Sequence, residues 1–115
     1  MYPDVSLHIN GQWTKGAEGK SEPILNPATG EKIGTLAHAT KPDLDMALQA
    51  ADDGFKVWKK TPADTRYKTL RKAAEIIRSR ADDIAKIMVM EQGKPLAEAK
   101  LETMLAGDIM DWFAE

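Results

Sequence analysis

The sequence contains no cysteine. Disulfide bonds, thiolate nucleophiles and cysteine-ligated zinc sites are therefore excluded within these 115 residues. Long apolar runs are also missing, because no segment stays apolar over the roughly 20 residues that a membrane-spanning helix needs. The first residues, Met1 to Asp4, lack the basic and apolar regions of a secretory signal. We therefore expect a cytoplasmic protein with no membrane partner.

A large excess of charge of either sign is absent too. Sixteen basic and eighteen acidic residues are interleaved, which leaves a net charge of -2 and predicts no nucleic-acid partner. Neither the glycine-rich dinucleotide fingerprint nor a phosphate-binding P-loop occurs. His8 and His38 have no second histidine at ligand spacing. We therefore predict no catalytic and no cofactor-binding residue in this chain.

Short strand signals fill residues 1–39. Asn10-Gly11 is a strong two-residue hairpin signal between the extended runs Leu7–Ile9 and Gln12–Thr14. A second pair of runs, 23–25 and 32–38, flanks a turn at Asn26 to Gly30. These patterns predict two β-hairpins.

Helical periodicity dominates residues 40–115. Thr40 and Asp43 form a predicted capping box, and a second box is predicted at Thr61 to Asp64 with Pro62 at the first helical position. A break is expected near Arg80, because aspartates at the two positions that follow Ala81 favour a first helical turn. The pattern predicts three to four α-helices. Apolar residues fall on one face of the first of these helices at Leu44, Ala47, Leu48, Ala51, Phe55 and Trp58.

The stretch EQGKPLAEAK, residues 91–100, interrupts the helical pattern. Gly93 suits the left-handed position that ends a helix, and Pro95 suits the first turn of the next helix. Lys94 is expected to be a solvated turn lysine, because no argument from burial supports a lowered pKa. This stretch therefore predicts a corner between two helices.

The last predicted helix carries an apolar stripe that continues almost to the end of the sequence. Its members are Leu101, Met104, Leu105, Ile109, Trp112 and Phe113. No C-terminal capping signal follows before Glu115, which suggests either truncation or a core that something else completes.

Several motifs, taken in order, resemble the N-terminal region of NAD(P)-dependent aldehyde dehydrogenases, with succinate-semialdehyde dehydrogenases the most similar branch. The similarity covers nearly all of the chain, although each motif alone is weak. The motifs are INGQW at 9–13, NPATGEKIG at 26–34, the Ala50 to Trp58 helix, Arg66 to Ala74, EQGKPLAEA at 91–99 and DWFAE at 111–115.

This resemblance implies an α/β parent fold in which residues 1–115 form the N-terminal part of the dinucleotide-binding domain. The catalytic domain would be absent from this chain, and the catalytic cysteine and base glutamate would lie beyond Glu115. The chain alone would then be inactive. The parent enzyme would use NAD or NADP to oxidise an aldehyde or semialdehyde to its acid, and it would be a homo-oligomer.

The resemblance also implies two local roles. A structural Na⁺ or K⁺ would be bound by the backbone carbonyls of Ile24 and Leu25 and by the Glu91 carboxylate, since such ions prefer hard oxygen ligands. The alternative is that Glu91 merely ends a helix. Glu102 and Ala106 would border the mouth of the substrate tunnel.

A non-enzymatic alternative stays open. Two hairpins and a helical bundle could form a complete interaction module that binds a partner through the apolar face at residues 101–113. A reading frame that continues past Glu115 with a cysteine-bearing family motif would favour the enzyme. A stop codon there, together with a folded monomer, would favour the module.

Overall fold

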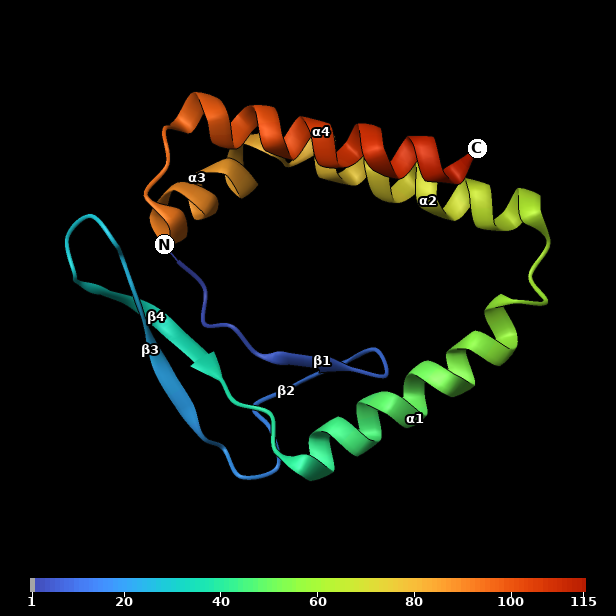
Figure 1. Ribbon diagram of the computed structural model, residues 1–115, viewed down its shortest axis with the longest axis horizontal. Coiled ribbons are helices and arrows are strands. Elements are labelled where there is room, and N and C mark those ends of the chain that lie inside the picture. The colour runs from blue at the N-terminus through green and yellow to red at the C-terminus, as the bar shows by residue number, and fades with distance from the viewer. Residues whose placement is uncertain (1) are drawn as a thin grey trace. The chain divides into compact units, whose positions relative to one another are not determined.

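A computed structural model describes residues 2–115, which form two compact units that meet in sequence between Lys60 and Thr61. The predicted class, two hairpins followed by helices, is confirmed. The first unit contains the four strands and the first helix, and the second contains three helices (Figure 1). The elements are β1 (Leu7–Ile9), β2 (Gln12–Thr14), β3 (Ser21–Leu25), β4 (Lys32–Ala37), α1 (Lys41–Trp58), α2 (Ala63–Ser79), α3 (Ala81–Gln92) and α4 (Leu96–Ala114).

The β1–β2 hairpin turns at the predicted dipeptide. Asn10 and Gly11 both have positive φ angles, 50° and 77°, which is the geometry of a tight hairpin turn. The strands pair antiparallel, and the rings of His8 and Trp13 lie across from each other with centroids 4.6 Å apart.

The β3–β4 hairpin is antiparallel, with a register irregularity after Ile24. At its turn the Asn26 side chain accepts a hydrogen bond from the Ala28 N–H at 2.9 Å, as the turn signal predicts. Val5 adds a short parallel bridge to Leu36, which joins the N-terminal segment to the edge of β4. The hairpin therefore gains a partial third strand.

Asp43 connects α1 to the loop that follows β2. Its Oδ2 atom accepts hydrogen bonds from the Thr40 N–H at 2.8 Å and the Thr40 hydroxyl at 2.7 Å, and the predicted capping box is present. The same carboxylate accepts the Ala17 N–H at 3.0 Å. These bonds lower the pKa of Asp43, first through the Thr40 N–H, then through the Thr40 hydroxyl and Ala17. Only 1% of Asp43 is exposed, so the residue is a buried link within the first unit.

In the second unit, α2 and α4 run side by side in opposite directions, and α3 packs against both (Figure 1). The core where they meet is built from alanines: Ala74, Ala85 and Ala99 are all 0% exposed. Small side chains let the helix backbones approach closely.

The breaks between the helices lie where the sequence patterns predict them, to within one residue. Arg80 separates α2 from α3 as expected, and Gly93 ends α3 in the left-handed region with a φ of 70°. The second predicted capping box, with Thr61 as N-cap and Pro62 as the first helical residue, is wrong by one position. Pro62 is the N-cap of α2, and its carbonyl accepts the Arg66 N–H at 3.1 Å.

The two faces of α4 differ in the size of their side chains. Its buried residues are the small ones, Ala99, Thr103 and Gly107, which lie four positions apart along one side. Its large apolar side chains point away from α2 and α3. The exposed fractions are Leu101 70%, Met104 41%, Leu105 51%, Ile109 49%, Trp112 78% and Phe113 77%.

The predicted apolar face of α1 is also largely exposed, with Leu44, Leu48 and Phe55 at 54%, 70% and 59%. Both helices therefore leave large apolar side chains uncovered among the residues that the structure describes. An apolar surface of this extent is typical of a protein-protein contact face.

Candidate functional site

The corner between α3 and α4 differs from the expected solvated turn. The ammonium group of Lys94 forms a close ion pair with the Glu102 carboxylate, two turns into α4. The Lys94 side chain is only 17% exposed, so the expectation of a solvated lysine is wrong. Lys94 directly precedes Pro95, the N-cap of α4, and its long side chain reaches Glu102 in the second turn of that helix. Glu102 stays half-exposed, at 51%.

A second ion-pair cluster connects α4 to α2. The Arg78 guanidinium donates to Asp108 at 2.7 Å and to Asp111 at 2.6 Å, and Arg71 approaches Asp111 at 3.1 Å. Arg78 crosses α4 over Gly107, where an added Cβ would lie 3.2 Å from the arginine side chain. The bonds to Asp108 and then Asp111 raise the pKa of Arg78 above its already high usual value. The Arg78 guanidinium therefore stays charged at every ordinary pH.

The two residues predicted at the tunnel mouth lie on the uncovered side of α4. Glu102 and Ala106 are one helical turn apart, and both are exposed. The tunnel itself stays a prediction. The structure adds that Glu102 is paired with Lys94, a link that sequence spacing did not reveal. Its two members lie eight positions apart, on either side of a proline, so no helical spacing rule relates them.

The residues predicted to bind Na⁺ or K⁺ lie in different units. Ile24 and Leu25 are on β3 in the first unit, and Glu91 is near the end of α3 in the second. Within residues 2–115 no group of three or more histidine, aspartate or glutamate side chains is arranged to bind a metal ion. A site made mainly of backbone carbonyls is a different kind of site, so the cation hypothesis stays a prediction.

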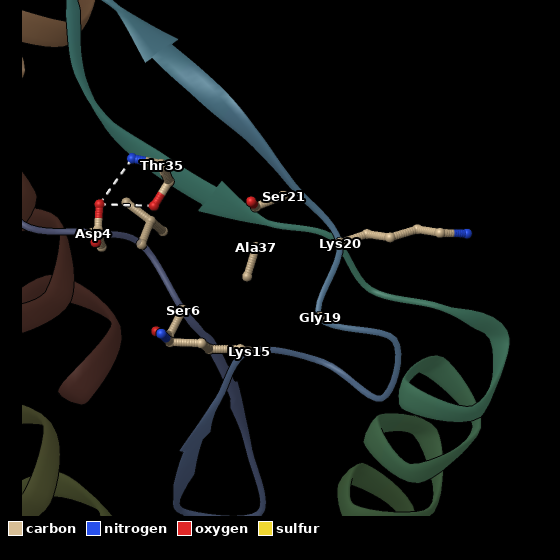
Figure 2. Close-up of a pocket in the computed structure, with 9 residues that line it drawn as sticks. Asp4, Ser6, Lys15, Gly19, Lys20, Ser21, Thr35 and Ala37 are labelled. Carbon is tan, nitrogen blue, oxygen red and sulfur yellow. Dashed lines mark hydrogen bonds between the residues drawn. The ribbon is translucent and has the colours of Figure 1, made fainter.

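The first unit also contains a small pocket beside the bridge between Val5 and β4 (Figure 2). Asp4 accepts hydrogen bonds from the Thr35 hydroxyl at 2.7 Å and the Thr35 N–H at 3.0 Å, and these two bonds lower the pKa of Asp4. Lys15 extends toward Ser6, whereas Lys20 points away from the pocket and pairs with Glu18 at 2.6 Å.

The groups that line this pocket are polar, and they could hydrogen-bond a small molecule. They include one carboxylate and one ammonium group that face the cavity, so their charges balance. The described part of the chain places no histidine or cysteine there. The pocket therefore offers polar contacts and hydroxyl groups but, among the described residues, no histidine that could activate them.

No helix within residues 2–115 is both long enough and apolar enough to cross a membrane.

A family model described as "Aldehyde dehydrogenase family" matches residues 13–115. Glutarate-semialdehyde dehydrogenase of Pseudomonas putida is 41% identical over 108 residues, which cover 94% of this chain and 22% of that protein. The Escherichia coli succinate-semialdehyde dehydrogenase [NADP(+)] GabD is 36% identical over 107 residues, covering 93% of this chain and 22% of that protein. The chain thus spans less than a quarter of the length of these relatives.

A solved structure of an aldehyde dehydrogenase has the same fold over this region. The crystal structure of succinate-semialdehyde dehydrogenase from Burkholderia pseudomallei matches with a TM-score of 0.92 and 34% sequence identity. The match covers 96% of this chain and 23% of that one. The two hairpins and four helices therefore form an arrangement that also occurs within a much longer protein.

Proposed function

The chain belongs to the aldehyde dehydrogenase family, and from this premise we propose that it is the N-terminal portion of an NAD(P)-dependent enzyme that oxidises a semialdehyde to its carboxylic acid. The observation that carries the proposal is the similarity to glutarate- and succinate-semialdehyde dehydrogenases over more than nine-tenths of the chain. The coverage of less than a quarter of each relative supports a role as one part of a longer enzyme.

The chemistry would require groups that this chain does not contain. Covalent aldehyde oxidation needs a thiolate nucleophile, a carboxylate that activates water, and a nicotinamide that accepts the hydride. The sequence has no cysteine, so the thiolate must come from elsewhere. We therefore expect the 115-residue chain alone to be inactive.

The contribution of this chain would be structural. In the second unit, α2 and α4 pack through small side chains, and ion pairs from Arg78 hold them together. This arrangement leaves the large apolar face of α4 free to pack against the rest of the enzyme. Within this proposal Glu102 and Ala106 border the substrate tunnel, and the enzyme is a homo-oligomer. A structural Na⁺ or K⁺ at Ile24, Leu25 and Glu91 belongs to the same proposal.

The direct test compares the natural full-length protein with the 115-residue chain. Each is mixed with succinate semialdehyde or glutarate semialdehyde and with NAD⁺ or NADP⁺, and formation of the reduced cofactor is followed by its absorbance. The proposal expects reduction only with the full-length protein, an aldehyde and a dinucleotide together. A full-length protein that reduces neither cofactor with any aldehyde would overturn it.

The second candidate function is an interaction module, which the exposed apolar face at residues 101–113 favours. On this reading the face binds a separate protein instead of the rest of the same enzyme. The two functions differ in the natural chain length and in aldehyde-dependent activity. A natural protein of 115 residues that is a folded monomer and lacks this activity would favour the module.

A further inference from the structure

The second half of α1 has no cover in the part of the chain that the structure describes. The first half packs against β1, and there Asp43 is buried while Ala47 and Ala50 are partly covered. From residue 51 to the end of the helix, in contrast, every residue is exposed. A helical segment of this length is only marginally stable in water without tertiary packing. We therefore expect the second half of α1 to be stabilised by a contact that the described chain does not supply.

One side of α1 is apolar. Its residues recur every three or four positions, which places them along one stripe of the helix. This set, the α1 stripe, consists of Leu44, Leu48, Ala51 and Phe55. The three large side chains of the stripe are each more than half exposed. A helix on the surface of a folded protein normally turns such a stripe toward a core.

The charged residues within α1 lie on the neighbouring side and pair with one another. Lys56 pairs with Asp52 at 2.7 Å and with Asp53 at 3.0 Å. Lys41 pairs with Asp45 at 2.6 Å. These pairs need no partner outside the helix, so the charged side can face water. The α1 stripe is therefore the side that is left for an apolar contact.

One cation lies close to the stripe, just past the end of the helix. The Lys59 ammonium is 5.1 Å from the centre of the Phe55 ring, which is a cation–π contact. Phe55 is still 59% exposed, so this single side chain does not cover the ring. A contact of this kind at an exposed site is weak. The flexible lysine side chain can therefore move aside when another group packs on the ring.

The occupant that the observations favour is the remainder of a longer polypeptide. The family model matches as far as residue 115, and the chain spans only 22% of the semialdehyde dehydrogenases that it matches. A second copy of the chain fits less well. Four partly exposed side chains of this kind offer roughly 300–500 Å², whereas each partner in a stable interface buries roughly 800 Å². A segment of the same polypeptide can dock on a smaller area, because covalent attachment gives it a high effective concentration.

We propose that the α1 stripe is a docking surface for the part of the full-length polypeptide that follows Glu115, and that this contact keeps the second half of α1 helical. The inference rests on the proposed function, which makes the chain one part of a longer enzyme. It adds a contact in the first unit to the one proposed for α4 in the second. The remaining polypeptide then packs on both compact units.

The experiment compares backbone hydrogen exchange in the 115-residue chain and in the natural full-length protein. Amides of residues 51–58 should be weakly protected in the 115-residue chain and about 100-fold or more better protected in the full-length protein, because packing suppresses local opening. The Ala17 amide, which already donates to Asp43 within the first unit, should change much less. This comparison needs no substitution, so it tests the inference even where a variant fails to fold.

Phe55→Gln then tests the stripe itself. In the full-length protein it should lower the protection of residues 51–58 by about tenfold to 100-fold, the effect of losing one buried apolar side chain. The matched control is Val57→Gln, because Val57 is 70% exposed and lies about 200° around the helix from Phe55. Glutamine is the better helix former at both positions, so neither substitution should lower protection in the 115-residue chain.

Four outcomes are decisive. Equal protection of residues 51–58 in the 115-residue chain and the full-length protein would overturn the inference. Equal losses in the two full-length variants would also overturn it, because the stripe would then have no special role. Protection in the 115-residue chain that rises with its concentration would mean that a second copy covers the stripe. Protected residues 51–58 in a full-length protein that reduces neither cofactor with any aldehyde would contradict the proposed function alone.

Discussion

Replacing Gly16 by alanine tests how the loop after β2 is held in the first unit. Gly16 has a φ of +82°, and an added Cβ would lie 2.7 Å from the backbone oxygen of His38. The left-handed conformation costs a residue with a side chain about 1–2 kcal/mol. The contact with a backbone atom adds about 1–3 kcal/mol, because the neighbouring backbone must move. We therefore expect Gly16→Ala to destabilise the loop by about 2–5 kcal/mol.

The control is Gly19→Ala, which has a φ of +62° and nothing within 4 Å of the added Cβ. It should cost only the conformational part, about 1–2 kcal/mol. The difference between the two variants isolates the contact with the His38 oxygen.

Native-state hydrogen exchange at the Ala17 amide is the assay, because this N–H donates to Asp43 and opens with the loop. Protection of Ala17 should fall about fivefold to 150-fold more in Gly16→Ala than in Gly19→Ala, at about tenfold per 1.4 kcal/mol. The Ala99 amide in α4 should be unaffected. Equal losses in the two variants would refute the reasoning.

Three further predictions concern other parts of the chain. The pKa of Asp43 is lowered in the folded state, so the unfolded chain binds protons more readily at this residue. The stability that Asp43 contributes is therefore lost as the pH falls through its folded-state pKa, and hydrogen-exchange protection of the Ala17 amide should fall with it. Asp43→Asn should abolish this acid-dependent loss of protection. Gly54→Ala should stabilise α1 by up to about 1 kcal/mol in urea unfolding, since nothing lies near the added Cβ, whereas Gly107→Ala should gain less because it crowds Arg78. The chain should bind a hydrophobic dye, and Leu105→Gln should reduce the dye fluorescence while circular dichroism stays unchanged.

The features that the sequence predicts correctly are local. The hairpin turn at Asn10-Gly11 and the left-handed end of α3 at Gly93 each depend on the conformational preference of one or two residues. The capping box of Thr40 and Asp43 depends on side chains three positions apart. Such signals act within a few residues, so the rest of the fold does not need to be known.

The features that the sequence misses depend on residues far apart in the chain. Asp43 bonds Ala17, and Arg78 bonds Asp111. The partners in each pair are far apart in the sequence, so no rule of residue spacing predicts that they meet. The sequence indicates an apolar stripe on α4 that this chain leaves uncovered, but it does not indicate that α4 packs through Ala99, Thr103 and Gly107. Small side chains allow close approach between helices, and hydrophobicity alone does not indicate this.

In the candidate site, too, the sequence predicted some features and missed others. Glu102 and Ala106 could be assigned to the tunnel mouth only through resemblance to a family. The ion pair between Glu102 and Lys94 became visible only in the folded chain, because Pro95 turns the backbone before α4 begins. Burial of Lys94 likewise depends on the path of the chain after the corner.

The central claim is that this chain is the N-terminal portion of a longer aldehyde dehydrogenase, and the intact mass of the natural protein tests it most directly. The 115 residues have a mass of 12.7 kDa and span 22% of the semialdehyde dehydrogenases that they match. The account predicts a natural protein with about four times this mass or somewhat more, by the ratio of lengths. A natural protein of 12.7 kDa would contradict the account and favour the interaction module.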